Sequence, residues 1–450
     1  PLKLAATLPP ELIAGTSPAS IDLAEDREQW NALCRDLGIP QPPGGTAVDA
    51  DGALAIAAQV GYPVLVRPSY VLGGRAMEII YDDAQMVRAM AEMSDFGSLG
   101  IEGGLSAERP VLVDRFLEDA TEVDVDAVRD RLGDVMIGAV MEHVEEAGVH
   151  SGDSACVIPP PHLSASVVAR IEDHTLAIAE ALDVRGPINV QFAVKDDEVY
   201  VIEANPRASR TVPFVAKATG VPLAKVASRV MMGATLAELR DEGLLCERVV
   251  GDHVAVKEAV LPFNRFPEAD PVLGPEMRST GEVMGIDLTT GLAFMKSQIS
   301  AGGALPESGT VFLSLADRDK VVGLEAARGL QDLGLDVVAT SGTAEYLRAN
   351  GVPVDTVVAK LGEEGTDAVE LVRSGAVQMV VNSPRGRGPR ADGEHIRAAA
   401  GAQGIPLMTT ANAALAAARG LADWQRFPLA VRTLQEYHRG VRRPEQEVVQ

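Results

Sequence analysis

The chain has 450 residues, of which 46% are hydrophobic and 23% charged, and its formal net charge is −24. This length predicts roughly two to four domains, and this composition excludes a disordered chain. The negative charge argues against nucleic acid or an anionic membrane as the main partner, although a nucleotide would need only a locally basic pocket.

The cysteines and the chain ends add three expectations. Cys34, Cys156 and Cys246 lack the spacing of disulfide or metal pairs, which indicates a reducing, cytoplasmic setting. No run approaches the ~18 apolar residues of a membrane helix, and no signal peptide precedes the first domain. Because the chain opens at Pro1 rather than Met, we interpret it as a piece of a longer protein.

The first predicted elements lead toward a basic hairpin. Residues 13–18 predict a short apolar strand into a turn, and the acidic helix that follows carries Arg27, which by itself would suit a solvated surface. A helix is expected from Asp51 to a Gly-Tyr-Pro break at Gly61. A strand is expected over 64–68.

Residues 64–81 predict a strand, a glycine loop and a second strand. Gly73 and Gly74 lie in the loop, with Arg67 and Arg75 on either side. Glycines let backbone N–H groups approach oxygen atoms closely. The loop is therefore a candidate to fold over phosphates.

Strands and loops alternate in the next stretch. Residues 94–109 are rich in Gly, Ser and Glu and predict a surface loop. Three strands are expected after it, over 111–117, 122–127 and 137–144. Acidic residues alternate along the second of them, at Glu122, Asp124 and Asp126, which predicts that some of the three face solvent.

His150, Ser151 and Asp153 lie in the loop after the last of these strands. They are the residue types of a nucleophilic triad. Consecutive loop residues rarely achieve triad geometry, however, and no nucleophile elbow is present. We interpret the loop as a binding loop.

A helix capped by Ser164 is expected to run to about Leu182 and to lead into a hairpin over 188–205. Apolar and polar residues alternate along both strands of this hairpin, and Asp196 and Asp197 form its turn. The chemistry of the chain is expected to centre on this hairpin.

Three side chains with oxygen ligands converge on the predicted hairpin. Residues two apart on a strand point to one face, so Glu203 and Asn205 project together and Gln191 can face them from the partner strand. A carboxylate and two amide oxygens suit Mg²⁺ shared with the phosphates of a nucleotide. Arg207 and Arg210 follow at once, and their guanidinium groups suit phosphate or carboxylate. An exposed hairpin with a polar edge would fit the same pattern.

The segment after the hairpin predicts fewer elements. Helices are expected over 213–220, 223–232 and 291–300, and a strand that carries Glu258 is expected over 253–261. Residues 264–309 are otherwise rich in Pro and Gly, and we place a domain boundary at about residue 302.

Five strands then alternate with helical segments, over 311–315, 337–340, 354–358, 379–382 and 407–409. This order predicts a small, parallel, doubly wound α/β sheet, in which ligands bind beyond the carboxyl ends of the strands. Thr343 is expected to open a helix whose N–H groups favour an anion, with Lys320 and Lys360 adding charge. Ordinary helix capping by Thr and Ser would explain each such loop taken singly.

Three segments carry a resemblance to a known family. Residues 67–77, 141–156 and 189–222, the last with Asn-Pro-Arg-Ala-Ser-Arg-Thr-Val-Pro-Phe at 205–214, closely resemble the carboxyl-terminal half of the carbamoyl-phosphate synthetase large subunit. The resemblance covers essentially the whole chain. The Thr-Val-Pro-Phe tail is similar to the second of the family's two synthetase units, and the unit after residue 302 is similar to its methylglyoxal-synthase-like regulatory domain.

This resemblance implies an α+β ATP-grasp fold followed by a small α/β doubly wound parallel-sheet, methylglyoxal-synthase-like domain. Residues 1–30 would be a remnant of the preceding domain, and residues 31–232 a carbamate-phosphorylating ATP-grasp domain. Residues 233–302 would be an extension with linker, and residues 303–450 an allosteric domain. The implied activity is phosphorylation of carbamate by ATP to carbamoyl phosphate and ADP, which feeds pyrimidine and arginine biosynthesis.

Matching motif positions carry the family's site residues over to this chain. Gln191, Glu203 and Asn205 would hold Mg²⁺ or Mn²⁺, and Arg207 and Arg210, with Asn205, would hold the transferring group and carbamate. The phosphates of ATP would lie against Arg27, Arg67, Gly73 and Gly74. Its adenine and ribose would lie against Arg115, Leu117, Glu122, Gly148, Val149, His150 and Ser151. Such a transfer needs mainly positioning and charge neutralisation, and no general base, because carbamate is itself the nucleophile.

The resemblance also implies two regulatory sites. Glu145, Asp153 and Glu258 match the family's ornithine-binding carboxylates. A nucleotide effector, UMP or IMP, matches Lys320, Thr340, Thr343, Lys360 and Asn382. The sequence departs from the family there, with Ser383 and Pro384 in place of two threonines and Ser341 in place of a histidine, so the choice between the two nucleotides stays open.

The implied partners are a glutamine amidotransferase small subunit, the amino-terminal half of the large subunit and the small-molecule effectors, in an oligomer without nucleic acid or membrane. Two other functions stay open. A biotin-carboxylase-like ATP-grasp ligase shares the metal hairpin, but it would not need the terminal α/β unit. A non-catalytic ATP-binding module would not need the intact metal trio and arginines.

Overall fold

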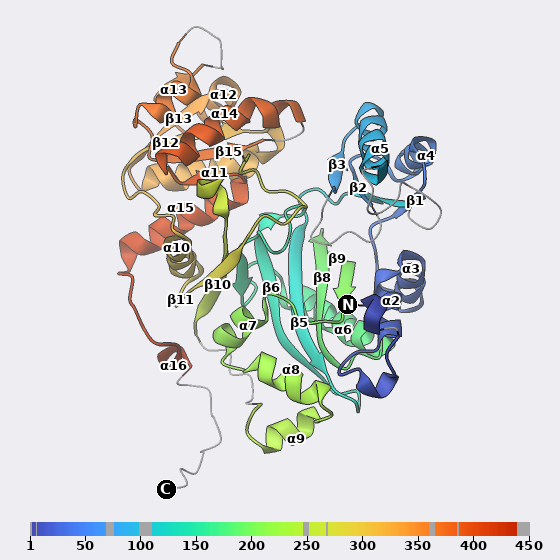
Figure 1. The fold of residues 1–450 in the computed structure, drawn as a ribbon. Coiled ribbons are helices and arrows are strands. Elements are labelled where there is room, and N and C mark those ends of the chain that lie inside the picture. Colours follow the sequence, from blue (N-terminus) through green and yellow to red (C-terminus); the bar gives the residue numbers. More distant parts are fainter. Residues whose placement is uncertain are drawn as a thin grey trace. The chain divides into compact units, whose positions relative to one another are not determined.

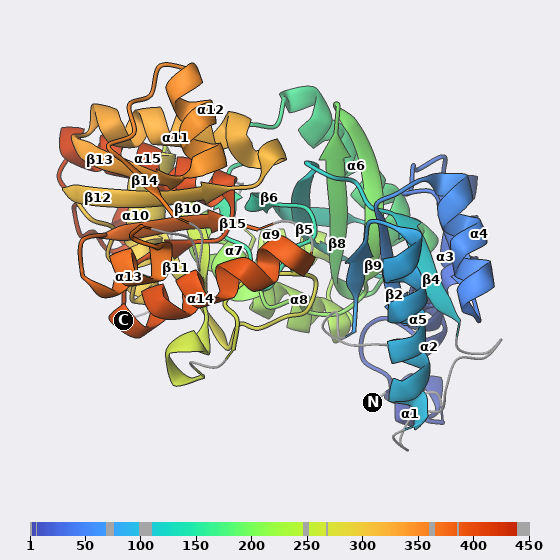
Figure 2. The ribbon, with the colours of Figure 1, turned by 90° about the horizontal axis from the view of Figure 1, so that it is seen from above.

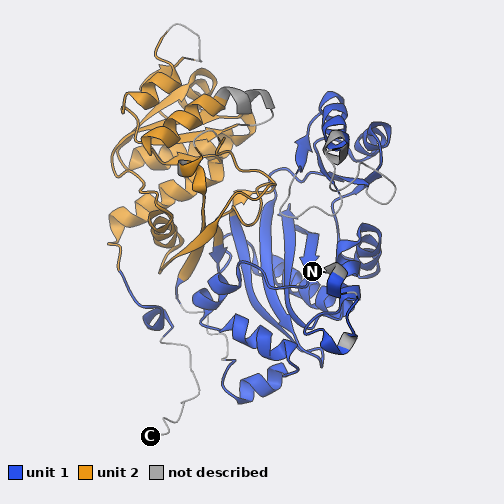
Figure 3. Cartoon of the chain, viewed as in Figure 1, with its two compact units in different colours: residues 1–143, 157–253, 431–450 blue, residues 144–156, 254–430 orange. Residues whose placement is uncertain are grey.

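The structure, a computed structural model, describes residues 2–5, 7–68, 76–98, 110–245, 252–266, 269–359, 365–384 and 387–438. It divides into two compact units, shown in Figure 3: unit 1 comprises residues 1–143, 157–253 and 431–450, and unit 2 comprises residues 144–156 and 254–430. Within the described ranges, no helix combines the length and apolar character that a bilayer span requires.

Unit 1 begins with short helical elements, α1 (Leu2–Ala5), η1 (Pro10–Leu12), α2 (Pro18–Glu25) and α3 (Arg27–Asp36). The predicted strand over 13–18 is wrong. Ser17 caps α2 by accepting a hydrogen bond from Ser20 N, and Pro18 takes the first helical position. Asp26 caps α3 in the same way, so Arg27 begins that helix.

A four-stranded antiparallel sheet follows in unit 1, in the order β1 (Gly44–Ala47), β4 (Val111–Arg115), β2 (Val64–Pro68) and β3 (Glu78–Ile80). The predicted strand pair around the glycine loop is confirmed, with Val64 opposite Ile80. The predicted helix from Asp51 is α4 (Ala50–Val60), which packs on this sheet.

Helix α5 (Asp83–Ser98), which was not predicted, also packs on the four-stranded sheet. Met86, Ala89, Met90 and Met93 are buried at helical spacing. The predicted surface loop is therefore wrong over 94–98, and its remainder lies outside the described residues.

A larger sheet carries the predicted central hairpin (Figure 1). Its strands in unit 1 follow the order β6 (Val135–Glu146), β5 (Thr121–Arg129), β8 (Gly186–Lys195) and β9 (Glu198–Asn205). The hairpin of β8 and β9 is confirmed, and its turn residues Asp196 and Asp197 adopt positive φ values of 51° and 62°.

The two faces of this sheet differ in polarity. Val125, Val190 and Val201 point to one face, where α6 (Ala165–Ala181) and Trp30 of α3 complete an apolar core. Residues one position away along the strands, such as Asp126, point to the opposite face. The remaining elements of unit 1 are β7 (Cys156–Ile158), which begins in unit 2, and α7 (Val212–Thr219), α8 (Leu223–Met231), α9 (Leu236–Asp241) and α16 (Leu434–Tyr437).

Unit 2 contains an antiparallel pair, β10 (Val254–Val260) and β11 (Gly281–Asp287), with α10 (Thr290–Ala301) packed against it and η2 (Pro262–Arg265) after β10. Strand β11 was not predicted, because its Gly-Glu-Val-Met-Gly run lies within a stretch rich in Pro and Gly. The predicted strand with Glu258 is confirmed as β10, and the helix expected near residue 291 is α10.

The predicted doubly wound parallel sheet of unit 2 is confirmed (Figure 2). Its strand order is β14 (Thr356–Val358), β13 (Leu335–Thr340), β12 (Gly309–Leu315), β15 (Met379–Ser383) and β16 (Leu407–Met408). The connecting elements are η3 (Asp317–Asp319), α11 (Lys320–Asp332), α12 (Ser341–Ala349), α13 (Ala368–Arg373), α14 (Arg387–Gln403) and α15 (Ala411–Arg426). All four strand pairings run parallel, which places the carboxyl ends of the strands along one edge.

Candidate functional site

The hairpin of β8 and β9 brings the predicted oxygen ligands together. Gln191 lies opposite Glu203 in the strand register, and a bulge follows Gln191. Asn205 Nδ2 donates a hydrogen bond to Glu203 Oε1 over 2.8 Å. The Glu203 side chain is 40% exposed, so its carboxylate can meet a ligand from solvent. A carboxylate beside two amide groups is a donor set that suits a hard cation.

Basic side chains adjoin this carboxylate in unit 1. Arg67 Nη1, on β2, lies 3.8 Å from Glu203 Oε2. Arg207 Nη2 donates to Asn205 Oδ1 over 3.1 Å. The arginine predicted beside the glycine loop and the one after β9 therefore converge on the same polar group, which gives a strongly acidic chain a local cluster of positive charge.

Arg27 also lies beside this group, and its assignment to a solvated surface is wrong. Arg27 Nη2 donates to Asp114 Oδ1 over 2.5 Å, and the two side chains are 16% and 12% exposed. Burial lowers the pKa of Arg27 and raises the pKa of Asp114, while their mutual attraction acts in the opposite direction on each. Asp114 thus fixes Arg27 at the end of β4.

The polar face of the sheet holds Asp126, a buried carboxylate to which no site role was assigned from the sequence. Asp126 is 1% exposed and accepts hydrogen bonds from Asn189 Nδ2, Ser209 Oγ and Thr211 Oγ1. Burial raises the pKa of Asp126 to about 6, against these three hydrogen bonds, which lower it. Some of the three acids of this strand were expected to face solvent, and Asp126 is not one of them.

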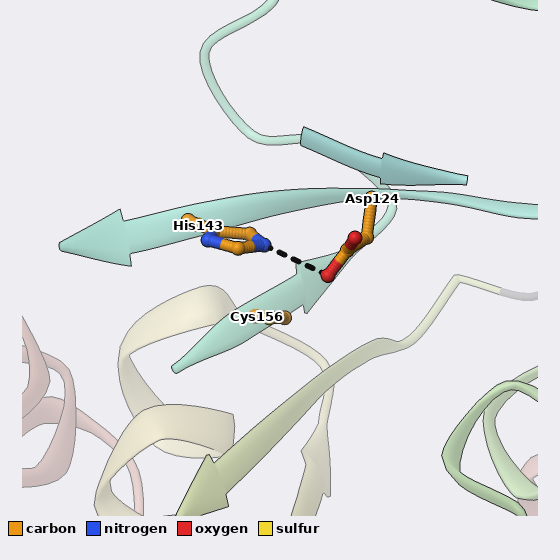
Figure 4. Close-up of side chains that lie close together, drawn as sticks. All are labelled: Asp124, His143 and Cys156. Carbon is orange, nitrogen blue, oxygen red and sulfur yellow. Dashed lines mark hydrogen bonds and ion pairs between the residues drawn. The ribbon is translucent and has the colours of Figure 1, made fainter. Parts of the chain in front are cut away.

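Asp124 is buried as well, and it lies beside His143 (Figure 4). His143 Nε2 is 3.1 Å from Asp124 Oδ2, and the two side chains are 1% and 2% exposed. His143 Nδ1 is 3.6 Å from Glu122 Oε2, and the Glu122 side chain is 24% exposed. The imidazole therefore lies between a buried carboxylate and one that solvent can reach.

The residues predicted to surround the nucleotide lie in different parts of the chain. Arg115 and Leu117 lie at the end of β4, where the Arg115 guanidinium donates to the Tyr62 carbonyl. Gly73 and Gly74 lie outside the described residues. The loop of Gly148, Val149, His150 and Ser151 belongs to unit 2.

Hydrogen bonds fix this loop within unit 2. His150 N donates to the Gly274 carbonyl over 2.8 Å, and the buried Lys257 donates to the Ser151 carbonyl over 2.9 Å. Asp153 accepts from Arg278 N and Ser279 N at 2.7 and 2.8 Å. Both carboxylate oxygens of Asp153 therefore bind backbone N–H groups, so Asp153 anchors the binding loop.

Two of the three acids predicted to bind a cation lie close together in unit 2. Glu145 accepts a hydrogen bond from Ala155 N over 2.8 Å, and Glu258 accepts one from Gln298 Nε2. Burial, and after it the neighbouring charge of Glu145, raises the pKa of Glu258 from 4.5 to about 8. The pair therefore favours either a bound proton or a bound cation.

Glu258 should make the stability of the chain depend on pH. Its pKa is higher in the folded chain, so it stabilises the fold at low pH, and we expect that contribution to be lost as pH rises from 4.5 to about 8. In urea unfolding, Glu258→Gln should show a shallower fall in the free energy of unfolding over this range. Glu276→Gln removes an exposed acid and serves as the control. An identical pH profile for Glu258→Gln and the parent chain would contradict the shift.

The carboxyl edge of the parallel sheet holds the four predicted effector residues that the structure describes, Lys320, Thr340, Thr343 and Asn382. Lys320 Nζ lies 2.6 Å from Asp317 Oδ1 and would be 3.7 Å from a Cβ added to Gly342, so its charge lies at the start of α12. The prediction that Thr343 opens a helix is wrong, because α12 begins at Ser341 with Thr340 as its cap. The Thr343 hydroxyl is 2% exposed and accepts a hydrogen bond from Leu315 N.

Asn382, at the end of β15, is held by a buried arginine that the sequence analysis missed. Arg397 Nη1 donates to Asn382 Oδ1 over 2.6 Å. The same guanidinium donates to both oxygens of Asp270, over 2.7 and 2.6 Å, and is 0% exposed. Lys360, the fifth predicted effector residue, lies outside the described residues.

Comparison with protein families matches both parts of the chain. Residues 26–239 match the model described as carbamoyl-phosphate synthase L chain, ATP binding domain, and residues 323–409 match the MGS-like domain. The chain is 52% identical over 432 residues to the carbamoyl phosphate synthase large chain of Gemmatimonas aurantiaca, covering 96% of this chain and 38% of that protein. The Mycobacterium tuberculosis H37Rv protein of the same name is 53% identical over 444 residues, which is 95% of this chain and 39% of that protein.

A solved structure supports the fold. The biotin carboxylase domain of 2-oxoglutarate carboxylase from Hydrogenobacter thermophilus, in complex with magnesium ADP and bicarbonate, has a TM-score of 0.54 and 17% identity, over 65% of this chain and 69% of that chain. At this identity the likeness shows the ATP-grasp fold alone. The chain spans 38% to 39% of the length of the two large chains above. By its two domain matches and this similarity along nearly all its length, the chain is similar to about two fifths of a carbamoyl phosphate synthase large chain, with an ATP-binding part and an MGS-like part.

Proposed function

We propose that this chain phosphorylates carbamate with ATP, yielding carbamoyl phosphate and ADP, as part of a carbamoyl phosphate synthase large chain. The observation that carries the proposal is the polar group at the end of β9, where Glu203 adjoins Asn205, Gln191 and Arg67. An amide-flanked carboxylate beside arginines matches what phosphoryl transfer demands, which is charge neutralisation and positioning.

The metal in this proposal is Mg²⁺ or Mn²⁺. Gln191, Glu203 and Asn205 would hold it through oxygen atoms only, which is the ligand type that both ions prefer. When bound, the ion supplies positive charge to the phosphates of the nucleotide. The Glu203 carboxylate lies 3.8 Å from Arg67 Nη1 and accepts a hydrogen bond from the Asn205 amide, so these side chains already surround its charge.

The chain's own residues would do the rest of the work. Arg27 and Arg67 would face the phosphates, together with Gly73 and Gly74, while Arg207 and Arg210 would orient carbamate and the transferring phosphoryl group. Adenine and ribose would lie against Arg115, Leu117, Glu122, Gly148, Val149, His150 and Ser151. Carbamate is itself the nucleophile, so the arginines need only align it with the phosphorus atom.

The reverse reaction tests this function without glutamine. We expect the chain to form ATP from carbamoyl phosphate and ADP in the presence of Mg²⁺, and to bind MgADP in calorimetric titration. A biotin-carboxylase-like activity would instead show bicarbonate- and biotin-dependent ADP release. The proposal fails if the chain binds MgADP but forms no ATP, or if it does not bind MgADP.

We propose regulation at two places in unit 2. The Glu145 and Glu258 pair would bind the ammonium group of ornithine, with Asp153 fixing the loop beside it. A nucleoside monophosphate, UMP or IMP, would lie at the carboxyl edge of the parallel sheet, where Lys320, Lys360 and the amides of α12 meet its phosphate near Thr340, Thr343 and Asn382. Its effect on carbamate phosphorylation would be a coupling free energy of about 1–3 kcal/mol.

Lys360→Ala should weaken nucleotide binding by about tenfold, because one charge-assisted hydrogen bond to phosphate is lost. Calorimetric titration of the chain with UMP and with IMP measures this, and the affinity for MgADP without effector should not change. Lys225→Ala, on α8 in unit 1, is the control. Nucleotide binding that survives Lys360→Ala would leave helix capping as the role of the neighbouring threonines.

The proposed partners are those of a large chain in this family. A glutamine amidotransferase small subunit would supply ammonia, and the amino-terminal half of the large chain would supply carbamate. The product would enter pyrimidine and arginine biosynthesis.

A further inference from the structure

We propose that Asp126 is a positioning residue for phosphoryl transfer, because it fixes the segment over 206–211 that carries Arg207 and Arg210. This inference rests on the proposed function, in which these two arginines orient the reacting groups. Asp126 touches no reacting atom itself. It acts through hydroxyl groups of the segment, which alternate along the sequence with the two arginines.

Three donors converge on the Asp126 carboxylate. Oδ1 accepts from Asn189 Nδ2 over 3.0 Å and from Ser209 Oγ over 2.7 Å, and Oδ2 accepts from Thr211 Oγ1 over 2.6 Å. Ser209 Oγ and Thr211 Oγ1 are also 2.6 Å apart. Asn189 belongs to the metal hairpin, so one buried carboxylate links β5, β8 and the arginine segment.

Along the segment, the residues that anchor it alternate with the arginines that would meet the ligand. Ser209 is half-buried and Thr211 is buried, whereas Arg207 and Arg210 are exposed. With the hydroxyls held inward, the segment presents Arg207 and Arg210 at the exposed surface, where a ligand can meet them. The anchor therefore restricts the backbone from which both arginines project.

The helix that follows provides independent support. Thr211 occupies the cap position of α7, where a threonine commonly accepts a hydrogen bond from the first turn, yet its side chain makes no capping bond. Its hydroxyl donates to Asp126 instead. A charge-assisted bond to a buried carboxylate is stronger than a neutral one, so the start of α7 is tied to the sheet rather than capped.

An isosteric change would weaken this anchor without emptying the space. Asp126→Asn keeps the shape of the side chain but removes its charge and replaces one accepting oxygen with a donating amide, so the hydroxyl bonds lose their charge assistance and one of them must reverse its direction. Thr211→Val removes one donor at nearly constant volume, and Thr211→Ser keeps it. Thr211→Ser should therefore restore what Thr211→Val loses if the hydroxyl, and not packing, positions the segment.

The matched control is a second buried carboxylate, at the end of the same strand. Asp130 directly follows β5, is 0% exposed and accepts hydrogen bonds from Leu132 N and Leu236 N over 2.8 and 2.7 Å. Its described partners lie away from the arginine segment. Asp130→Asn thus removes an equally buried charge without touching Ser209 or Thr211, and it measures the cost of destabilisation alone.

The test measures the parameters of ATP synthesis from carbamoyl phosphate and ADP together with amide hydrogen exchange over 206–211. Asp126→Asn and Thr211→Val should lower kcat by about tenfold or more with an unchanged KM for ADP, because orientation of the transferring group is lost. Both should speed exchange in the segment, while Asp130→Asn and Thr211→Ser should do neither.

The outcomes separate this inference from the proposed function. One outcome is that the parent chain forms no ATP, while Asp126→Asn and Thr211→Val still speed amide exchange over 206–211. The proposed function would then fail, and Asp126 would remain the anchor of the segment. Unchanged exchange and unchanged kcat in these variants, with an active parent chain, would overturn the positioning role. A fall in kcat that Asp130→Asn reproduces would overturn it as well, because general destabilisation would then explain the loss.

Discussion

Replacing Glu203 by Gln should lower the rate of ATP synthesis from carbamoyl phosphate and ADP by roughly two orders of magnitude or more, which is the loss expected when a key electrostatic contact is removed. The substitution keeps the shape of the side chain and its place opposite Gln191. It removes the one negative charge in the trio, so a divalent cation would be held by amide oxygens alone. Initial rates at saturating MgADP measure the effect.

A matched substitution at the other end of β9 separates this loss from damage to the strand. Glu198→Gln removes a carboxylate that is 50% exposed and lies beside the hairpin turn. We expect it to leave the rate nearly unchanged. Near-parent activity in Glu203→Gln would remove Glu203 from the metal site, and the polar-edge interpretation of the hairpin would then stand.

The hairpin and the parallel sheet could be predicted because their signals are local. The hairpin follows from the alternation of apolar and polar residues before Asp196 and, up to a bulge, after Asp197, and the register places Gln191 opposite Glu203 as expected. The parallel sheet follows from five apolar strands separated by helical segments. In both cases residues close in sequence decide the structure, so spacing carries the information.

The buried acids show where such reasoning ends. Alternation along β5 correctly predicts that Asp124 and Asp126 share a face, but it cannot say what covers that face. The partners that bury Asp126 lie 63 to 85 positions further along the chain. Their hydroxyl and amide groups would suit a surface loop equally well, so only the fold reveals that they meet one carboxylate.

Arg397 was missed for the same reason. It lies 127 positions from Asp270, and a single arginine on a helix predicts a solvated charge. The structure instead places it in the interior of unit 2, between the loop before β11 and the end of β15. Gly393 allows this, because a Cβ there would overlap both Arg397 Nη1 and Asn382 Oδ1.

Arg397→Met should lower the free energy of unfolding by about 3 kcal/mol, because breaking a buried ion pair leaves the partner charge without compensation. The guanidinium is 0% exposed, and Asp270 is 23% exposed, so some water can reach the abandoned carboxylate. Asn382 loses its hydrogen bond at the same time. Chemical unfolding of the full chain measures this change in the free energy of unfolding, with a spectroscopic signal that arises in unit 2.

A double substitution shows whether the lost energy belongs to the pair. Asp270→Asn in the Arg397→Met background removes the abandoned charge and should recover more than half of the stability, whereas Asp270→Asn alone should destabilise. Arg419→Met breaks a pair with Glu325 whose side chains are 51% and 63% exposed, and it should cost less than about 1 kcal/mol. Equal effects of Arg397→Met and Arg419→Met would show that the buried pair contributes no more than a surface one, and Arg397 would then merely fill space beside Asn382.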